Sequence, residues 1–272
     1  MYGILCSILL RVISDSHRSD LVPADQHRYV PWNIYRLDKR ARVAAPLLVH
    51  LIRAYDQALR NSNPNCIVIW HSACILLTVD INVLERATGR DGPRSMSECR
   101  SSLTTWVQTS AARRACLHAA QTFRALLHRK PVNGTAFQSV RALFISALVL
   151  SLYILTTSPH SATDDTSQCD PFDLSGADFD WKVVGDEGIS DSDKAIMALS
   201  ETSNSEHPAV NFIRFGGPIV FNGKTYRPGA RYAQRMILEF ASLLDEVSTH
   251  WMADYARLLY MVHDTMVGHD SV

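Results

Sequence analysis

The sequence lacks the glycine-rich loops that bind phosphate groups in nucleotide-dependent enzymes. Its 12 glycines form neither a GxxxxGKS/T nor a GxGxxG pattern, and such loops need closely spaced glycines to expose their backbone amides. The densest glycine cluster is Gly89-Arg90-Asp91-Gly92-Pro93. Because glycine tolerates positive φ and proline fits the first turn of a helix, this pentapeptide indicates a turn between two helices.

Hydrolase signatures are absent as well. The sequence contains no GxSxG and no HExxH pattern, and its 11 histidines are dispersed. A catalytic site assembled from distant positions would need convergent ionisable groups, and the candidates near one predicted helix are His71, Asp80 and Glu85. The two carboxylates are more typical of a solvated helix end. We therefore expect a protein that is not an enzyme, with an all-α enzyme as a less favoured alternative.

Cysteine is scarce, with six residues in 272 and none of the tight spacings of a disulfide-stapled secreted module. This usage favours reduced thiols in the nucleus or cytosol. His71 and Cys74 are one helical turn apart, as two metal ligands on one helix would be, but Cys116 and His118 are two apart and point to different helix faces. The sequence therefore predicts no metal site and no cofactor here, and these four residues are interpreted as core histidines and buried thiols.

No apolar run has the length of an ordinary membrane span. The run over residues 142–155 has 14 residues and contains two serines, whereas a spanning helix needs about 20 residues. The apolar segment over residues 1–13 has no basic region and no small-residue cleavage site, so a signal peptide is not expected. The longer run is interpreted as a buried helix, and the two runs together support membrane association as the second functional alternative.

Neither sign of charge is in excess over the whole chain, because 27 Lys and Arg balance 27 Asp and Glu. The two halves differ, since residues 1–158 carry 19 basic and 9 acidic side chains and residues 159–272 carry 8 and 18. The arginines of the basic half are scattered at helical spacing, which is typical of solvated helix faces. Direct nucleic-acid binding by this chain is therefore not favoured.

What the sequence does contain is apolar residues at helical spacing. Offsets of three and four predict a helix over residues 44–60 with Pro46 in its first turn, and one central helix over 66–87 that begins at Asn63-Pro64. A small hairpin is expected at Asn222-Gly223, a pair suited to a type I′ turn. Further helices are predicted over 93–106, 111–129 with Ser110 as its N-cap, 140–156, 236–247 and 251–262.

An acidic insert interrupts this helical pattern. Residues 159–193 contain 10 acidic side chains and one lysine, which predicts a solvated linker or loop that is disordered in part. Within it, Phe172, Leu174, Phe179 and Trp181 alternate with aspartates. Two interpretations stay open: a disordered activation segment whose apolar groups dock into a coactivator, or a surface loop anchored by one or two aromatic residues.

Four motifs follow one another in the middle of the chain: Trp70-His71 with the apolar stretch 72–79, the turn Ala87-Thr88-Gly89-Arg90-Asp91-Gly92-Pro93, Trp106, and AARRACLHAAQ over 111–121. An apolar stretch that ends in an aromatic residue comes next, over 144–153. In this order they resemble the regulatory domain, or middle homology region, of fungal zinc-cluster and zinc-finger transcription factors. The resemblance spans about residues 66–155. It implies an all-helical domain that restrains or transmits the activation of transcription. The motifs that carry the resemblance are packing and turn motifs rather than catalytic residues.

The zinc module that usually precedes this domain is missing. It would need six clustered cysteines or repeated CxxC and HxxxH pairs, and residues 1–65 contain only Cys6. Zinc is therefore expected only in an absent upstream finger, and the chain would reach DNA only through such a module. A truncated gene model, a fragment of a longer factor and a paralogue that has lost its finger are the three explanations.

These observations predict an all-α, multi-helix regulatory domain. Residues 1–158 are expected to form the helical core, 159–205 an acidic linker or loop, and 206–272 a C-terminal helical segment packed on the core. The expected function is non-enzymatic control of RNA polymerase II transcription in the nucleus. Expected partners are transcriptional coregulators or another transcription factor, with no preference for membranes, and homodimerisation stays open. No catalytic, cofactor-binding or metal-binding residue is predicted.

Overall fold

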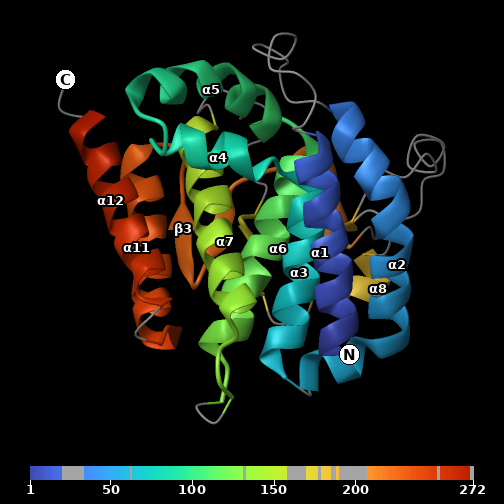
Figure 1. Cartoon of the computed structure of the whole chain (residues 1–272). Helices are drawn as coiled ribbons and strands as arrows, with labels where there is room; N and C mark the ends of the chain where they lie inside the picture. Colours follow the sequence, from blue (N-terminus) through green and yellow to red (C-terminus); the bar gives the residue numbers. More distant parts are fainter. Residues whose placement is uncertain are drawn as a thin grey trace.

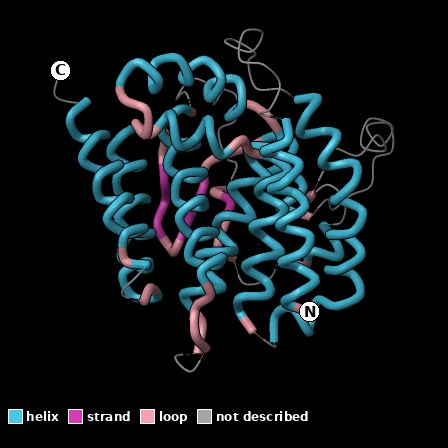
Figure 2. Tube along the Cα trace, viewed as in Figure 1, coloured by secondary structure: helices cyan, strands magenta, loops and turns pink. Residues whose placement is uncertain are grey.

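Helices account for most of the regular structure (Figure 1, Figure 2). The computed structural model describes residues 1–19, 34–61, 63–130, 133–157, 170–176, 179–184, 188–189, 207–249 and 252–269. Within these residues the helices surround one continuous hydrophobic core, and a sheet of three short strands lies among them. The predicted all-α class is confirmed.

Helix α3 occupies the centre of the first half of the chain, where it packs against α1, α2 and α6. Nearly all of its side chains are buried, as its all-round apolar sequence predicts. The helices of this half are α1 (Tyr2–Ser19), α2 (Ile34–Asn61), α3 (Pro64–Thr78), α4 (Ile81–Ala87), α5 (Pro93–Val107) and α6 (Ser110–Leu127).

The second half of the chain adds helices that join the same bundle. These are α7 (Phe137–Thr156), α8 (Trp181–Val184), α10 (Pro208–Phe215), α11 (Ala230–Val247) and α12 (Asp254–His269). Helix α7 packs between α6 and α11, and α12 packs on α11 at one side of the molecule (Figure 1). The C-terminal helices therefore complete the core rather than form a separate unit.

The sheet consists of β1 (Phe172–Asp173), β2 (Ile219–Phe221) and β3 (Lys224–Tyr226). Strands β2 and β3 form the hairpin predicted at Asn222-Gly223, where φ is positive at both residues, 47° and 69°. Strand β1 pairs in parallel with β2. This strand was not predicted, because it belongs to the acidic insert, whose composition favours a loop.

The single helix predicted over residues 66–87 is wrong. The chain bends by 83° between α3 and α4, at Val79, which has extended backbone angles (φ −136°, ψ 137°). Asp80 then caps α4, because its carboxylate accepts a hydrogen bond from the amide of Asn82 at 3.0 Å. The indole of Trp106 donates to the carbonyl of Thr78 at 3.1 Å, which satisfies a carbonyl group that the end of α3 leaves open.

The starts of α2 and α6 also differ from the predictions. Helix α2 begins at Ile34, so Pro46 lies inside it rather than in its first turn. Helix α6 is capped by Thr109 rather than Ser110, since the side chain of Thr109 accepts a hydrogen bond from the amide of Ala112 at 3.1 Å. Two adjacent residues of similar capping ability cannot be ranked by spacing alone.

Candidate functional site

Two of the motifs quoted above meet where α3 packs against α6. Trp70 and His71 lie on α3, His118 and Gln121 lie on α6, and all four side chains are buried. The Nδ1 atoms of His71 and His118 are 2.9 Å apart. This contact places two polar rings against each other inside the core.

Hydrogen bonding determines where this histidine pair holds its protons. The Nε2 atom of His118 lies 2.8 Å from the carbonyl oxygen of Gly188, and a carbonyl only accepts, so Nε2 carries the proton. Nδ1 of neutral His118 is then an acceptor, and His71 donates from its own Nδ1. Burial lowers the pKa of His118 to about 3, the Gly188 carbonyl opposes this shift, and the charge of Arg114 adds to it. His118 is therefore neutral at physiological pH.

Trp181 completes an aromatic–histidine cluster, which consists of Trp70, His71, His118 and Trp181. The ring of Trp181 stacks on the imidazole of His118 with centroids 4.4 Å apart and an interplanar angle of 11°. It meets Trp70 edge-on at 5.4 Å. Trp181 is buried, and its indole nitrogen has no hydrogen-bond partner among the described residues. The cluster thus joins α3, α6 and α8 through ring contacts.

The segment that carries Trp181 is held along α6 by its backbone carbonyl groups. We call its described residues, 170–176, 179–184 and 188–189, the strap. Gln121 donates to the carbonyls of Leu174 at 3.0 Å and Gly176 at 3.3 Å, and Arg124 donates to Gly176 at 3.3 Å. With His118, these donors follow one another along α6 at intervals of three residues, so each is about one turn further on.

The interpretation of the acidic insert as a free activation segment is wrong for its described residues. Leu174 is 0% exposed, Phe179 6% and Trp181 2%, and Phe172 stacks on Phe212 with ring centroids 5.0 Å apart. Side chains that fill the core are not available to a coactivator. The alternative, a loop anchored by aromatic residues, describes the strap. Residues 158–169 and 190–206, which contain other acidic positions of the insert, lie outside the described residues.

Cys74 and Cys116 do not join the two histidines in a metal site. Both thiols are buried, and burial raises the pKa of each well above its ordinary value. Such a shift disfavours the thiolate form that binds metals. Among the residues that the structure describes, no three His, Cys, Asp or Glu side chains group closely enough to hold a metal ion.

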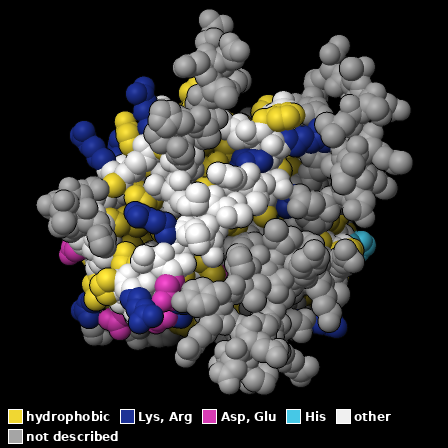
Figure 3. All heavy atoms as spheres, turned by 90° about the horizontal axis from the view of Figure 1, so that it is seen from above, with side chains coloured by type: hydrophobic (Ala, Val, Ile, Leu, Met, Phe, Trp, Pro, Cys, Tyr) yellow, Lys and Arg dark blue, Asp and Glu magenta, His cyan; other side chains and the backbone are white. Residues whose placement is uncertain are grey.

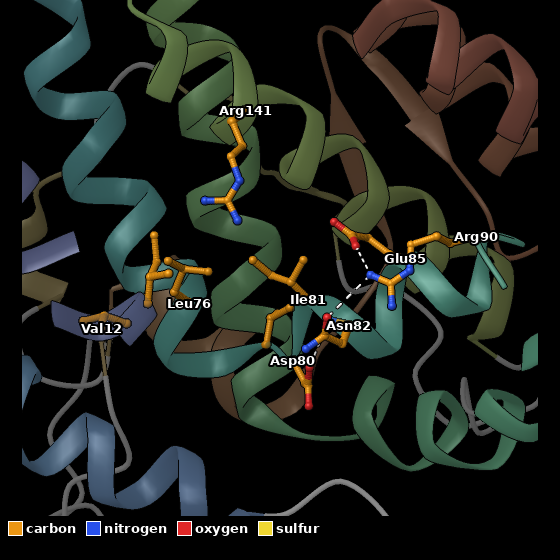
Figure 4. A pocket seen from close by; sticks show the side chains of 10 residues that line it. Val12, Leu76, Asp80, Ile81, Asn82, Glu85, Arg90 and Arg141 are labelled. Atoms are coloured by element: carbon orange, nitrogen blue, oxygen red, sulfur yellow. Dashed lines mark hydrogen bonds and ion pairs between the residues drawn. The ribbon is translucent and has the colours of Figure 1, made fainter. Parts of the chain in front are cut away.

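A separate pocket of about 260 Å³ lies at the bend between α3 and α4 (Figure 4). Asp80 and Glu85, two of the candidate catalytic residues, both line it, whereas the third, His71, belongs to the aromatic–histidine cluster. Its apolar wall consists of Val12, Ile13, Leu76, Val79 and Ile81. Its polar lining consists of Asp80, Asn82, Glu85, Arg90 and Arg141.

The two carboxylates of the pocket support the two ends of α4. Glu85 forms an ion pair with Arg90, which also reaches Asp91 at 3.3 Å. Asp80 is occupied by its capping contact with the amide of Asn82. These contacts are those of a helix end, which is the structural role that the sequence predicts for the two acids.

Arg141 is the residue of this pocket that the sequence analysis missed. Its guanidinium extends from α7 toward Leu76 and Ile81 (Figure 4), and it forms no hydrogen bond or ion pair with the described residues. Burial raises the pKa of Tyr255, while Arg141 opposes the shift and Glu85 adds to it, so both charges act on the same hydroxyl group. A signal was present in the sequence, because Arg141 is the only charged residue of an apolar helix.

Basic side chains do not gather on the face shown in Figure 3. Among the described residues of this face, Lys and Arg lie in several separate places, some among apolar side chains and some beside acidic ones. Elsewhere, Arg113 serves the fold, since it donates to the carbonyls of Ile213 at 2.6 Å and Arg214 at 2.9 Å. The described residues of this face therefore form no dense basic patch of the kind that binds nucleic-acid phosphates.

No family model, curated protein sequence or solved structure matches this chain. The resemblance to the fungal regulatory domain therefore rests on the quoted motifs and on where they lie. One set forms the contact between α3 and α6. The other is the turn between α4 and α5, where Gly89 and Gly92 have positive φ values of 101° and 85°, as a turn rich in glycine predicts.

Proposed function

We propose that this chain is a non-enzymatic regulatory domain of a fungal transcription factor, which helps to control RNA polymerase II transcription in the nucleus. The observation that carries the proposal is the position of the motifs that resemble the fungal regulatory domain. Trp70, Trp106 and most of the stretch over 111–121 lie in the core and hold helices together. A family defined by packing motifs predicts this placement.

Each tryptophan of these motifs links two helices. The indole of Trp70 donates to the carbonyl of Leu48 on α2 at 3.0 Å, and that of Trp106 donates to the carbonyl of Thr78 on α3 at 3.1 Å. A buried aromatic ring with a satisfied donor restricts how two helices can shift against each other. In this proposal the helices are a scaffold, and the output is contact with coregulators or with another transcription factor.

DNA binding, in this proposal, belongs to a zinc module outside the chain. Residues 1–65 contain one cysteine, Cys6, and a structural zinc site needs four ligands from cysteine and histidine side chains. The domain would reach its target genes through such a module or through a partner that carries one.

Membrane association is the second candidate function, and α7 is the observation that favours it. This helix has the length and composition of a membrane span, and α3 with α4 passes the same test as a pair bent by 83°. In the structure, however, α7 is covered by α3, α6 and α11. A helix that is apolar all round and buried among other helices is also what the core of a bundle in water requires, so we rank this function second.

Tethering to a promoter tests the first proposal. The full chain is fused to a DNA-binding module that has no activity of its own, and reporter transcription is compared with that from the module alone. We expect the fusion to change reporter output and Trp70→Ala, which opens the core, to abolish the change. Arg231→Ala alters an exposed arginine and should behave as the unaltered chain does. A folded, nuclear fusion without effect on the reporter would contradict the proposal.

Fractionation of the tagged chain distinguishes the two candidates. A nuclear regulatory domain should leave the membrane pellet on washing with salt or alkaline buffer. Retention in the pellet after alkaline extraction would instead support the membrane function, because only inserted proteins resist that treatment.

A further inference from the structure

The pocket at the bend between α3 and α4 contains one charge that the described fold does not pair. Arg141 is half-buried, and its guanidinium points toward Leu76 and Ile81 (Figure 4). It forms neither a hydrogen bond nor an ion pair with the described residues. A guanidinium group presents several donors in a plane that match a carboxylate in bidentate fashion. Arg141 is therefore the group of this pocket that is best placed to receive an anion.

The other charges of the pocket limit the anion to a single negative charge. The carboxylates of Asp80 and Glu85 line the same space. They would repel a doubly charged group such as a phosphate monoester more strongly than a carboxylate. The ion pair between Glu85 and Arg90 occupies the second arginine, which leaves Arg141 alone to bind the ligand's charge.

The apolar lining and the volume of the pocket indicate what the rest of the ligand is. Val12 and Leu76 are buried and Ile81 is half-buried, and together they present an apolar wall beside Arg141. The volume of about 260 Å³ is below the roughly 300–1,000 Å³ of pockets for drug-sized ligands. A molecule with a short hydrocarbon chain fits this space.

We propose that this pocket binds a short aliphatic monocarboxylate, with the carboxylate on Arg141 and the hydrocarbon chain against Val12, Leu76 and Ile81. The pocket lies where α1, α3, α4 and α7 meet, so an occupant contacts four helices at once. If the domain is regulatory, as proposed above, such a ligand is its effector. Binding itself does not depend on that function and is measured on the purified chain.

Calorimetry with four probes that each contain six carbon atoms in a straight chain tests the proposed chemistry. Hexanoate should bind at one site per chain, and 1-hexanol, hexylammonium and hexyl phosphate should each bind at least about tenfold more weakly. Equal binding of 1-hexanol would show that the apolar wall binds the ligand without help from Arg141, and this would overturn the proposal. Equal or tighter binding of hexyl phosphate would overturn the preference for a single charge, and absence of hexanoate binding would overturn the site.

Variants locate the binding site on the chain. Arg141→Gln should weaken hexanoate binding at least about tenfold, and Arg141→Lys should keep part of it because the charge remains. Arg231→Gln is the matched control, since this arginine is exposed at the start of α11, and it should bind hexanoate as the unaltered chain does.

A second variant decides the question if Arg141→Gln does not fold. Ile81→Phe leaves Arg141 in place and fills the pocket with a larger ring, so it should abolish binding, with thermal unfolding as the check on its fold. Normal hexanoate binding by a folded Ile81→Phe protein would overturn the proposal. A failed promoter-tethering experiment would leave these binding results unchanged, so the two proposals can fail separately.

Discussion

The Nδ1 atoms of His71 and His118 lie 2.9 Å apart in the core, so one hydrogen bond joins two buried imidazole rings. The arrangement works only while each ring keeps one tautomer, with His71 as the donor and His118 as the acceptor. A second proton at this contact would set two N–H groups against each other where water cannot separate them. The pair therefore makes the stability of the domain sensitive to acid.

The first prediction is that the free energy of unfolding falls as the pH falls below neutrality. The pKa of His118 is about 3 in the folded chain against an ordinary value of 6.5, so the unfolded chain takes up this proton first. The stabilising contribution is complete above about pH 6.5 and declines by up to about 1.4 kcal/mol per pH unit from there toward pH 3. Urea unfolding between about pH 7 and 5 measures the slope.

Two histidine variants separate this effect from other titrations. His118→Gln should lose the part of the slope that comes from one proton. His128→Gln changes an exposed histidine and should keep the slope. Equal slopes for His118→Gln and the unaltered chain would mean that His118 is not held in its neutral form by burial.

The second prediction concerns Gly188, where the strap crosses the aromatic–histidine cluster. A Cβ atom at this position would lie 2.8 Å from Cγ1 of Val184 and 3.2 Å from the ring of Trp181. Gly188→Ala should therefore lower the free energy of unfolding by about 1–3 kcal/mol, as overpacking of a core does. Gly134→Ala is the control, because no atom lies within 4 Å of its added Cβ, and it should cost less than about 0.5 kcal/mol. Equal stability of both variants would contradict the packing of the strap.

The third prediction compares two buried tryptophans. The indole nitrogen of Trp106 donates to the carbonyl of Thr78, whereas that of Trp181 has no hydrogen-bond partner among the described residues. Replacement of each by Phe removes the same atoms from the core. Trp106→Phe should cost about 1–3 kcal/mol more than Trp181→Phe, since it leaves a buried carbonyl without its partner. Urea unfolding of the two variants measures the difference, and equal costs would refute the assigned roles.

The fourth prediction is that the purified chain carries no stoichiometric zinc. His71 and His118 bond to each other rather than face a common ligand, and burial raises the pKa values of the thiols of Cys74 and Cys116. Elemental analysis after dialysis should find far less than one zinc per chain. A zinc content near one per chain would contradict the prediction.

Features that depend on a few consecutive residues could be predicted from the sequence. Helix α3 begins at Asn63-Pro64 because the asparagine side chain accepts a hydrogen bond from a helix amide and the proline occupies the first turn. The hairpin forms at Asn222-Gly223 because both residues tolerate positive φ. The apolar residues at helical spacing over 236–247 likewise predicted α11, and the side of α11 that carries them is buried.

Contacts between distant residues could not be predicted in this way. Apolar spacing identified the helix over 66–87 but not its bend, because Trp106 and Asp80 satisfy the backbone at the break from outside the local pattern. Composition predicted a solvated insert. Burial of Trp181 against α3 and α6 outweighed that local polarity. A buried aromatic ring stabilises the folded state, and the described acidic neighbours of Trp181 keep their contact with water because they stay exposed.

The sequence by itself determined the helical class, most helix positions and the hairpin, because backbone conformation and side-chain period are set within a turn or two of the chain. The tertiary structure alone decided that His71 meets His118, 47 residues away, and that Arg141 shares a pocket with Glu85. Periodicity shows which face of a helix is apolar, but not which face of another helix will cover it. That choice depends on how the side chains of two helices interdigitate, and this in turn sets which polar groups are buried together.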